Sequence, residues 1–528
     1  MGGPRFVFGR EQMIDSITCQ TLDTPCQRMA WFVLLLLLSL SCSAAVRPNV
    51  VLVFTDDQGW ADIGVHEVRD DIRTPNIDAL ARSGIRFESG YVTSPVCIPS
   101  RAGILSGIYP QRFSVESHLD APMPTAVKTL AERLRDAGYR TGMVGKWHLE
   151  PNVESEGWLR NAVYIGRALP PLAKRRIPTD LAQPFMPRNQ GFDDYFAGYF
   201  GQYDTNYQLD GATRAEDDGP LRAEGDRVDV QTAAAMAFIE RRAAAFQSGE
   251  RAPFFLYLAY FAPHVPLAAS PDYLARFPRE RTDSGAKDVA ERRRYALAMM
   301  AAIDDGVGRL RGRLADLGWL NDTLFFFISD NGAPLALDKA DRRPIDAIGW
   351  NGSLNDPFKG EKGMLTEGGI RVPFLLSWPN RVAAGVVNAA PVSTLDVVPT
   401  VLAAAGLARD EQLDGEDLLT LEQKDATQRP IFWRFRHQGA IRLGNWKYLR
   451  AADREYLFDL ASDPGEKCNR SAENAHLMEG LRRRWEAWNG TLARPTDGDG
   501  SKMGPLEQAM FDKYLPRSAE LSCPHVKD

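Results

Sequence analysis

Apolar runs of strand length alternate with longer amphipathic stretches over most of this chain. The expected strands are residues 49–54, 85–91, 139–144, 253–260 and 323–329, and the expected helices between them are 77–83, 125–137, 228–246 and 289–317. This alternation is typical of a sheet that is covered by helices on both faces. The sequence therefore predicts an α/β fold built on a large mixed, mostly parallel sheet flanked by helices.

The pattern changes in the C-terminal part of the chain. A polar stretch runs from about residue 423 to 430, four short strand-like runs follow within 431–460, and an amphipathic stretch covers 472–488. Consecutive short strands separated by turn residues are typical of antiparallel pairing. We therefore expect a large domain at 46–422 and, at 423–528, a small α+β domain with an antiparallel sheet, a helix and a tail.

The N-terminus has the features of an export signal. Arg28 precedes an apolar run at 30–40, and Ser43-Ala44-Ala45 offers small residues for cleavage. A charged residue, a short apolar run and small residues are typical of a signal peptide rather than of a membrane-spanning helix. We expect residues 1–45 to be a leader, with Met29 as an alternative start. The mature chain would then be exported to a periplasm, a lumen or the medium, without a stable membrane span.

Composition narrows the class of protein further. The 528 residues are 44% apolar and 25% charged, with a net charge of -6, which fits a large globular enzyme and gives no sign of a nucleic-acid partner. Removal of the leader leaves Cys97, Cys468 and Cys523. An exported chain with an odd number of cysteines has one that needs another explanation. If Cys97 is modified, Cys468 and Cys523 are free to pair in an oxidising compartment.

Two pairs of oxygen-bearing side chains directly follow expected strands. Asp56 and Asp57 follow the first strand, and Asp330 and Asn331 follow the fifth. Either pair alone is more often a solvated turn. The carboxyl ends of parallel strands, however, meet at one edge of a sheet, and carboxylate and amide oxygens are ligands of Ca²⁺ and Mg²⁺. Together the two pairs predict a divalent metal site.

Cationic and titratable side chains follow other expected strands. Lys146 and His148 come after strand 139–144, His264 lies between two prolines after strand 253–260, and Lys362 lies in a glycine-rich segment. Each has an ordinary interpretation, as a surface residue, a turn or part of a flexible connector. Their repeated position after strands favours one shared site at the sheet edge. The remaining histidines, including His66, lack such a setting, and we expect structural or surface roles for them, with His437 as the first candidate for an exception.

Cys97 begins the segment Cys97-Ile98-Pro99-Ser100-Arg101, which is followed by an apolar run that ends at Gly107. A plain interpretation is a buried cysteine before a helix, because proline suits the first helical turn and cysteine is often buried. The segment alone does not decide between this interpretation and a special role for Cys97.

The order of these segments resembles that of the type I, formylglycine-dependent sulfatases of the alkaline phosphatase superfamily. The resemblance rests on Asp-Asp, Cys-x-Pro-Ser-Arg, Lys-Trp-His, Pro-His-x-Pro, Asp-Asn-Gly and Gly-x-Lys with Glu-Gly-Gly-x-Arg-x-Pro, and it covers residues 48–460. It implies an alkaline phosphatase-like fold in which the large domain is catalytic. It also implies a sulfuric ester hydrolase, similar to arylsulfatases, that acts on a sulfated small molecule or saccharide. We expect a sulfated carbohydrate.

The resemblance also implies a metal site and a modified residue. A calcium or magnesium ion would be held by Asp56, Asp57, Asp330, Asn331 and residue 97. A maturation enzyme would be a partner of this chain, because it would convert Cys97 to formylglycine (3-oxoalanine). The hydrated aldehyde would offer one hydroxyl to attack a sulfate ester and a second to expel sulfate, which a thiol lacks.

The remaining roles follow residue by residue from the same resemblance. Arg101 and Lys146 would hold the formylglycine hydrate, and His148 would take the proton whose removal releases sulfate. His264 would assist the leaving oxygen, and Lys362 would bind the sulfate group.

The chain departs from the family pattern at two positions. Glu150 stands where glycine is usual, which leaves the local pocket shape open, and Ser106 stands where threonine is usual.

Two alternative functions are compatible with the same residues. One alternative is a phosphoester or phosphonate hydrolase on the same scaffold, because the same metal and cations suit phosphate. The other is a sulfated-glycan-binding protein without catalysis, although the complete set of expected catalytic residues argues against it.

Overall fold

The computed structural model describes residues 47–198, 200–215, 218–278, 287–335, 349–421, 427–493 and 503–517. The expected leader lies outside these residues and remains a prediction. Cys523 also lies outside them, so its pairing with Cys468 remains a prediction. Among the described helices, none combines the length and the apolar character needed to cross a bilayer.

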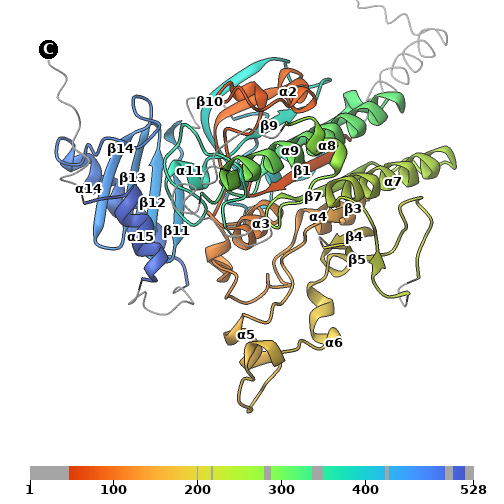
Figure 1. The fold of residues 1–528 in the computed structure, drawn as a ribbon, viewed down its shortest axis with the longest axis horizontal. Coiled ribbons are helices and arrows are strands. Elements are labelled where there is room, and N and C mark those ends of the chain that lie inside the picture. The colour runs from red at the N-terminus through yellow and green to blue at the C-terminus, as the bar shows by residue number, and fades with distance from the viewer. Residues whose placement is uncertain are drawn as a thin grey trace, which may run out of the picture. The chain divides into compact units, whose positions relative to one another are not determined.

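A ten-stranded mixed sheet forms the centre of the fold, in the order β10-β2-β9-β8-β1-β7-β3-β4-β5-β6. Figure 1 labels several of its strands, among them β1 and β7. The four central strands β8, β1, β7 and β3 pair in parallel, whereas β9 runs antiparallel to both β8 and β2. This arrangement confirms the mixed α/β fold expected from the sequence. The strands are β1 (Asn49–Asp56), β2 (Ile85–Tyr91), β3 (Arg140–Gly145), β4 (Asp194–Gly198), β5 (Gln202–Thr205), β6 (Leu221–Arg222), β7 (Phe254–Pro263), β8 (Thr323–Ser329), β9 (Phe374–Ser377) and β10 (Val386–Ser393).

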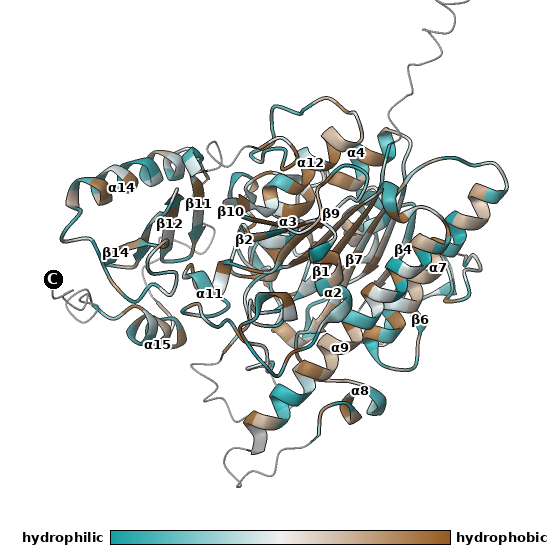
Figure 2. Ribbon diagram, turned by 90° about the horizontal axis from the view of Figure 1, so that it is seen from above, coloured by the Kyte–Doolittle hydropathy of each residue, from teal (hydrophilic) through white to brown (hydrophobic). Residues whose placement is uncertain are grey.

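Strand β1 is apolar on both faces because helices cover both faces of the sheet. Leu52 and its alternate neighbours pack in one cluster with α3 (Cys97–Ser106), α4 (Leu130–Asp136) and α12 (Val397–Ala404). Val51 and Val53 pack in a second cluster, whose helices are α2 (Pro75–Arg82), α7 (Arg227–Gln247) and α9 (Lys287–Asp316). Figure 2 shows the hydrophobic strands between these helices. A strand buried on both sides reads as a continuous apolar run, which is why the sequence indicated it clearly.

Helix α4 is shorter than the helix expected at 125–137. It begins at Leu130, because the Thr129 hydroxyl accepts the backbone N–H of Glu132 while the Glu132 carboxylate accepts the N–H of Thr129. This reciprocal cap fixes the start of the helix. Residues 151–190, between β3 and β4, contain two short helices, α5 (Glu156–Ala162) and α6 (Thr179–Ala182).

The C-terminal strands form the expected separate antiparallel sheet, in the order β11-β12-β13-β14. One face packs against the tryptophans of α14, and the other face contributes to the same core as the large sheet. The described residues beyond 46 therefore form a single compact unit. The expected boundary at 422/423 falls at residues outside the described ranges and remains a prediction. The elements are β11 (Ile431–Phe435), β12 (Gln438–Leu443), β13 (Trp446–Ala451), β14 (Arg454–Asp459), α14 (Ala475–Gly490) and α15 (Pro505–Tyr514).

Candidate active site

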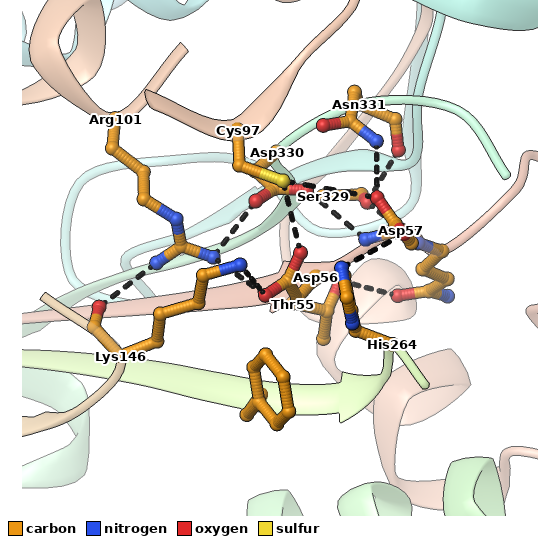
Figure 3. A network of polar contacts seen from close by, with 12 residues as sticks. Thr55, Asp56, Asp57, Cys97, Arg101, Lys146, His264, Ser329, Asp330 and Asn331 are labelled. Atoms are coloured by element: carbon orange, nitrogen blue, oxygen red, sulfur yellow. Dashed lines mark hydrogen bonds and ion pairs between the residues drawn. The ribbon is translucent and has the colours of Figure 1, made fainter. Parts of the chain in front are cut away.

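The two carboxylate pairs meet at one edge of the large sheet. Strands β1 and β8 are parallel neighbours whose registers align at their carboxyl ends, so the residues after both strands lie side by side. The backbone N–H of Asp57 donates to Asp330 Oδ1 at 3.0 Å, and Asn331 Nδ2 donates to Asp57 Oδ1 at 2.6 Å (Figure 3). All of these side chains are buried.

Asp57 has an unusual backbone conformation for a residue other than glycine. Its φ of 62° lies in the left-handed region, and the Asn351 side chain donates to its carbonyl oxygen at 2.9 Å. A strained backbone held by buried neighbours is a common feature of functional sites. Asn351 is a supporting residue that the sequence did not indicate, since an amide in a polar segment carries no specific signal.

Cys97 is the first residue of α3, and its side chain faces this carboxylate cluster. Its Sγ lies 3.3 Å from Asp56 Oδ1 and 3.3 Å from Lys362 Nζ. Burial, together with the negative charges of Asp330 and Asp56, raises the pKa of the thiol well above its ordinary value. The thiolate is the nucleophilic form of cysteine, so an unmodified Cys97 would be a poor nucleophile here.

Three cations surround the same group of atoms. Lys146 Nζ donates to Asp56 Oδ2 at 2.5 Å, and Lys362 Nζ lies 2.7 Å from Asp57 Oδ1. Burial opposes the charged forms, but Lys146 still holds the pKa of Asp56 well below its ordinary value. Asp57 likewise holds the pKa of Lys362 well above its ordinary value, so the ammonium stays charged.

Arg101 lies one helical turn after Cys97 and is fully buried. Its guanidinium donates to Asp330 Oδ2 at 2.7 Å, to the Lys146 carbonyl oxygen at 2.9 Å and to the Tyr257 hydroxyl at 3.4 Å. The planar donor group is therefore fixed in direction before any ligand binds. Tyr257, like Asn351, is a support that no sequence pattern indicated.

The two expected catalytic histidines differ in their surroundings. His264 Nε2 is 3.6 Å from Asp57 Oδ2, its Nδ1 is 2.6 Å from the carbonyl oxygen of Val265, and its ring stacks on Phe261. His148 has a φ of 63°, and its Nδ1 is buried without a hydrogen-bond partner in the described part of the chain. Burial and then the charge of Lys146 lower the pKa of His148, so it is a neutral base.

The donor set fits a hard divalent cation. The ligand atoms of Asp56, Asp57, Cys97 and His264 lie within 4.8 Å of one another. Asn331 Oδ1 is buried and accepts no hydrogen bond from any residue that the structure describes. Burial and then the charge of Asp56 raise the pKa of Asp330 to about 7. Ca²⁺ and Mg²⁺ bind oxygen ligands, so the buried carboxylates and the Asn331 carbonyl oxygen without a hydrogen-bond partner are suitable ligands for either ion.

The structure shows the contacts of Ser106 and Glu150, the two residues that depart from the family pattern. The hydroxyl of Ser106 donates to the Ala102 carbonyl oxygen, one turn earlier in α3, at 2.7 Å, and a threonine hydroxyl can form the same bond. Burial raises the pKa of Glu150, and its Oε2 has no hydrogen-bond partner among the described residues. Glu150 lies in the loop after β3, and Lys146 in the same loop contacts Asp56.

Comparison with known families places this chain in one family. A family model described as "Sulfatase" matches residues 48–407, and one described as "N-sulphoglucosamine sulphohydrolase, C-terminal" matches residues 360–488. The chain belongs to the sulfatase family. Sulfatases are sulfuric ester hydrolases, and this assignment confirms both the resemblance and the reaction class expected from the sequence.

Curated sulfatases align over most of the chain. N-acetylgalactosamine-6-sulfatase of Mus musculus is 32% identical over 450 residues, covering 78% of this chain and 75% of the relative. Arylsulfatase A of Homo sapiens is 30% identical over 491 residues, covering 83% of this chain and 86% of the relative.

A solved structure agrees with these alignments. The crystal structure titled as Ps i-CgsB in complex with k-i-k-neocarrahexaose matches with a TM-score of 0.67 and 29% identity. The match covers 90% of this chain and 99% of that chain. The small antiparallel sheet lies within residues 360–488, which the C-terminal family model matches.

Proposed function

We propose that this sulfatase hydrolyses sulfate esters of a carbohydrate with a formylglycine at position 97 and a calcium or magnesium ion. The observation that carries the proposal is the convergence of Cys97, three cations and four oxygen-bearing side chains at one buried sheet edge. A thiol in this setting is protonated and inert. Conversion of residue 97 to formylglycine would supply the two hydroxyls of the hydrated aldehyde, which the thiol lacks.

The chain's own residues divide the work of binding. Asp56, Asp57, Asp330 and Asn331 would hold the cation together with residue 97, and the cation would polarise the sulfate oxygens. Lys362 would bind a sulfate oxygen. Fixed cations stabilise the charge of a transition state without reorganisation, and loss of one strong donor costs about 3 to 4 kcal/mol.

Residue 97 and the two histidines would complete the chemistry. As a hydrated aldehyde, residue 97 supplies one hydroxyl for attack and a second for release of sulfate. Arg101 and Lys146 would orient these hydroxyls. His148, neutral because of burial, would accept a proton, and His264 would assist the oxygen that leaves with the sugar.

A saccharide substrate is supported by the names of relatives. N-acetylgalactosamine-6-sulfatase is named for a sulfated amino sugar, and the Ps i-CgsB crystal contains neocarrahexaose. We propose a sulfated carbohydrate for this chain too, and export of the mature protein by its expected signal peptide.

The test of this proposal is the desulfation of a panel of defined sulfated saccharides. The protein is produced with and without a formylglycine-generating enzyme, and a Cys97→Ala variant serves as the control. We expect turnover only from the preparation matured by that enzyme, because neither cysteine nor alanine offers two hydroxyls at position 97.

Peptide mass spectrometry of the segment that contains residue 97 checks the chemical state directly. We expect formylglycine in proportion to the activity of each preparation. A fully active preparation with only intact cysteine at position 97 would overturn the proposal.

A further inference from the structure

The segment that carries Lys362 is held by a residue of the small sheet. Gln438 is the first residue of β12, and only 2% of it is exposed. Its Nε2 donates to the carbonyl oxygen of Gly363 at 2.8 Å, and its Oε1 accepts the backbone N–H of Leu365 at 2.8 Å. The side-chain amide of Gln438 therefore forms two hydrogen bonds with the backbone on the C-terminal side of Lys362.

Two further backbone contacts place Lys362 between the other parts of the site. The N–H of Lys362 donates to the Ala333 carbonyl oxygen at 3.1 Å, and the N–H of Gly363 donates to the Pro95 carbonyl oxygen at 2.9 Å. Ala333 follows the Asp330 pair, and Pro95 precedes Cys97. Lys362 is thus tied to both loops of the site, while Gln438 holds the same segment through Gly363 and Leu365.

The far end of the segment is also anchored by the small sheet. Lys447 of β13 lies 2.8 Å from Glu367 Oε1 and 2.9 Å from Glu466 Oε1, and the N–H of Glu367 donates to Glu466 Oε2 at 2.7 Å. The side chains of all three residues are fully buried. The backbone around 363–367 therefore has little freedom to move relative to β12 and β13.

We propose that Gln438 is a positioning residue for Lys362, so that the small sheet takes part in catalysis by fixing the sulfate-binding lysine. This inference rests on the proposed role of Lys362. The Lys362 ammonium reaches both Asp57 and Cys97 Sγ, at 2.7 and 3.3 Å, from a glycine-rich segment that has no regular structure to hold it. An amide is needed at position 438 because it donates one hydrogen bond and accepts another.

The test compares Gln438→Met with Gln111→Met. Methionine keeps the length of the side chain and removes both hydrogen bonds. Gln111 is a matched control, since it is fully buried and its amide also donates to the small sheet, at the Arg434 carbonyl oxygen rather than at the Lys362 segment.

Two measurements separate positioning from general loss of stability. The first is the rate of reductive methylation of Lys362, followed by peptide mass spectrometry with exposed Lys128 as the internal reference. The second is kcat and KM for the member of the sulfated saccharide panel that the wild-type protein desulfates. A misplacement of about 1 Å costs up to roughly 100-fold in rate.

We expect Gln438→Met to label faster at Lys362 and to lose at least about tenfold in kcat/KM. Gln111→Met should change neither quantity. An unchanged labelling rate in Gln438→Met, or an equal change in Gln111→Met, would show that Gln438 does not position Lys362. If labelling shifts as expected but the wild-type protein hydrolyses no sulfate ester, the positioning stands and the proposed function fails.

Discussion

His264 lies at the rim of the buried cluster, where 23% of its side chain is exposed. Its Nδ1 faces a carbonyl oxygen and so carries a proton, while Nε2 points toward Asp57. Burial, opposed by the charge of Asp57, lowers the pKa of His264 to about 4, so the ring is neutral before substrate binds. An anionic sulfate ester beside the ring favours the imidazolium, which can then protonate a leaving oxygen.

From this geometry we predict that His264→Ala loses more activity on sugar sulfates than on activated aryl sulfates. Only a poor leaving group needs strong protonation, and general acid catalysis contributes about 10² to 10⁴ in rate. The comparison is of kcat/KM on the two substrate classes, with exposed His476→Ala as the control. Equal losses on both classes would remove His264 from the acid role.

His66 has a purely structural setting that predicts a pH effect on stability. Its ring stacks on Trp60, its Nδ1 bonds to the Trp60 carbonyl oxygen at 2.7 Å, and burial lowers its pKa from 6.5 to about 3. Between pH 6.5 and 3 the unfolded chain binds a proton at this residue and the folded chain does not. Stability therefore falls as pH falls through this window, by about 1.4 kcal/mol per pH unit.

The variant that tests this effect is His66→Asn, which keeps a donor near the Trp60 carbonyl oxygen. We expect the apparent free energy of unfolding in urea to fall less in the variant than in the wild type between pH 7.5 and pH 4.5. Parallel losses in the two proteins would mean that His66 is not buried in its neutral form.

The sequence indicated the residues that carry charge or react but not those that hold them in place. Asp56, Asp330 and Lys146 were recognisable because they stand at or directly after strand ends and because their order matches a family. Asn351, Tyr257 and Gln438 belong to segments without such a pattern. Their roles depend on contacts across about 70 to 290 residues of chain, and local sequence carries no signal for such contacts.

At the scale of elements, the adjacent ends of β1 and β8 predict dependence on a metal. Asp56, Asp57 and Asp330 gather three buried carboxyl groups at one sheet edge, and a metal ion would add positive charge to that of the surrounding lysines and arginine. We expect chelation to abolish activity, and Ca²⁺ or Mg²⁺ to restore it, because hard cations prefer these oxygen donors. Activity before and after chelation and metal addition is the measurement.

Asn331→Ala should weaken metal binding by roughly tenfold or more, since it removes the buried Oδ1 that has no other partner among the described residues. Titration calorimetry with the metal alone measures this change. Asn380→Ala, an exposed amide elsewhere on the molecule, is the control. Full activity in a metal-free preparation would contradict the proposed metal site.

Long buried elements could be predicted from the sequence, and short ones could not. The expected strand at 323–329 coincides with β8, and the expected helix at 228–246 lies within α7. Strands β4, β5, β6 and β9 have five residues or fewer, and a helical or strand period cannot be recognised over so short a run. Helix α4 was misjudged because a cap, not the apolar pattern, decides where it starts.

At the scale of the whole molecule, the two sheets share a core and a buried ionic group. Lys447 belongs to β13, Glu367 begins α11 (Glu367–Ile370) next to the large sheet, and Glu466 follows β14. Tyr91 of β2 donates to Glu367 Oε2 at 2.6 Å, so the group is continuous with the large sheet. The sequence predicted two sheets, but their shared core follows only from the tertiary packing.

Lys447→Met should therefore destabilise the molecule as a whole. It leaves Glu367 and Glu466 buried without their common cation, and an uncompensated buried charge costs about 3 to 5 kcal/mol. We expect the apparent free energy of unfolding in urea to fall by about 3 kcal/mol or more. Lys128→Met, which breaks an exposed pair with Asp136, should cost less than about 1 kcal/mol. A triple variant that adds Glu367→Gln and Glu466→Gln should recover part of the loss, because it removes the two buried carboxylates that shared Lys447; the recovery is only partial because Arg371 then loses its ion pair with Glu367. If the triple variant were less stable than Lys447→Met alone, hydrogen bonding rather than charge would hold the two sheets together.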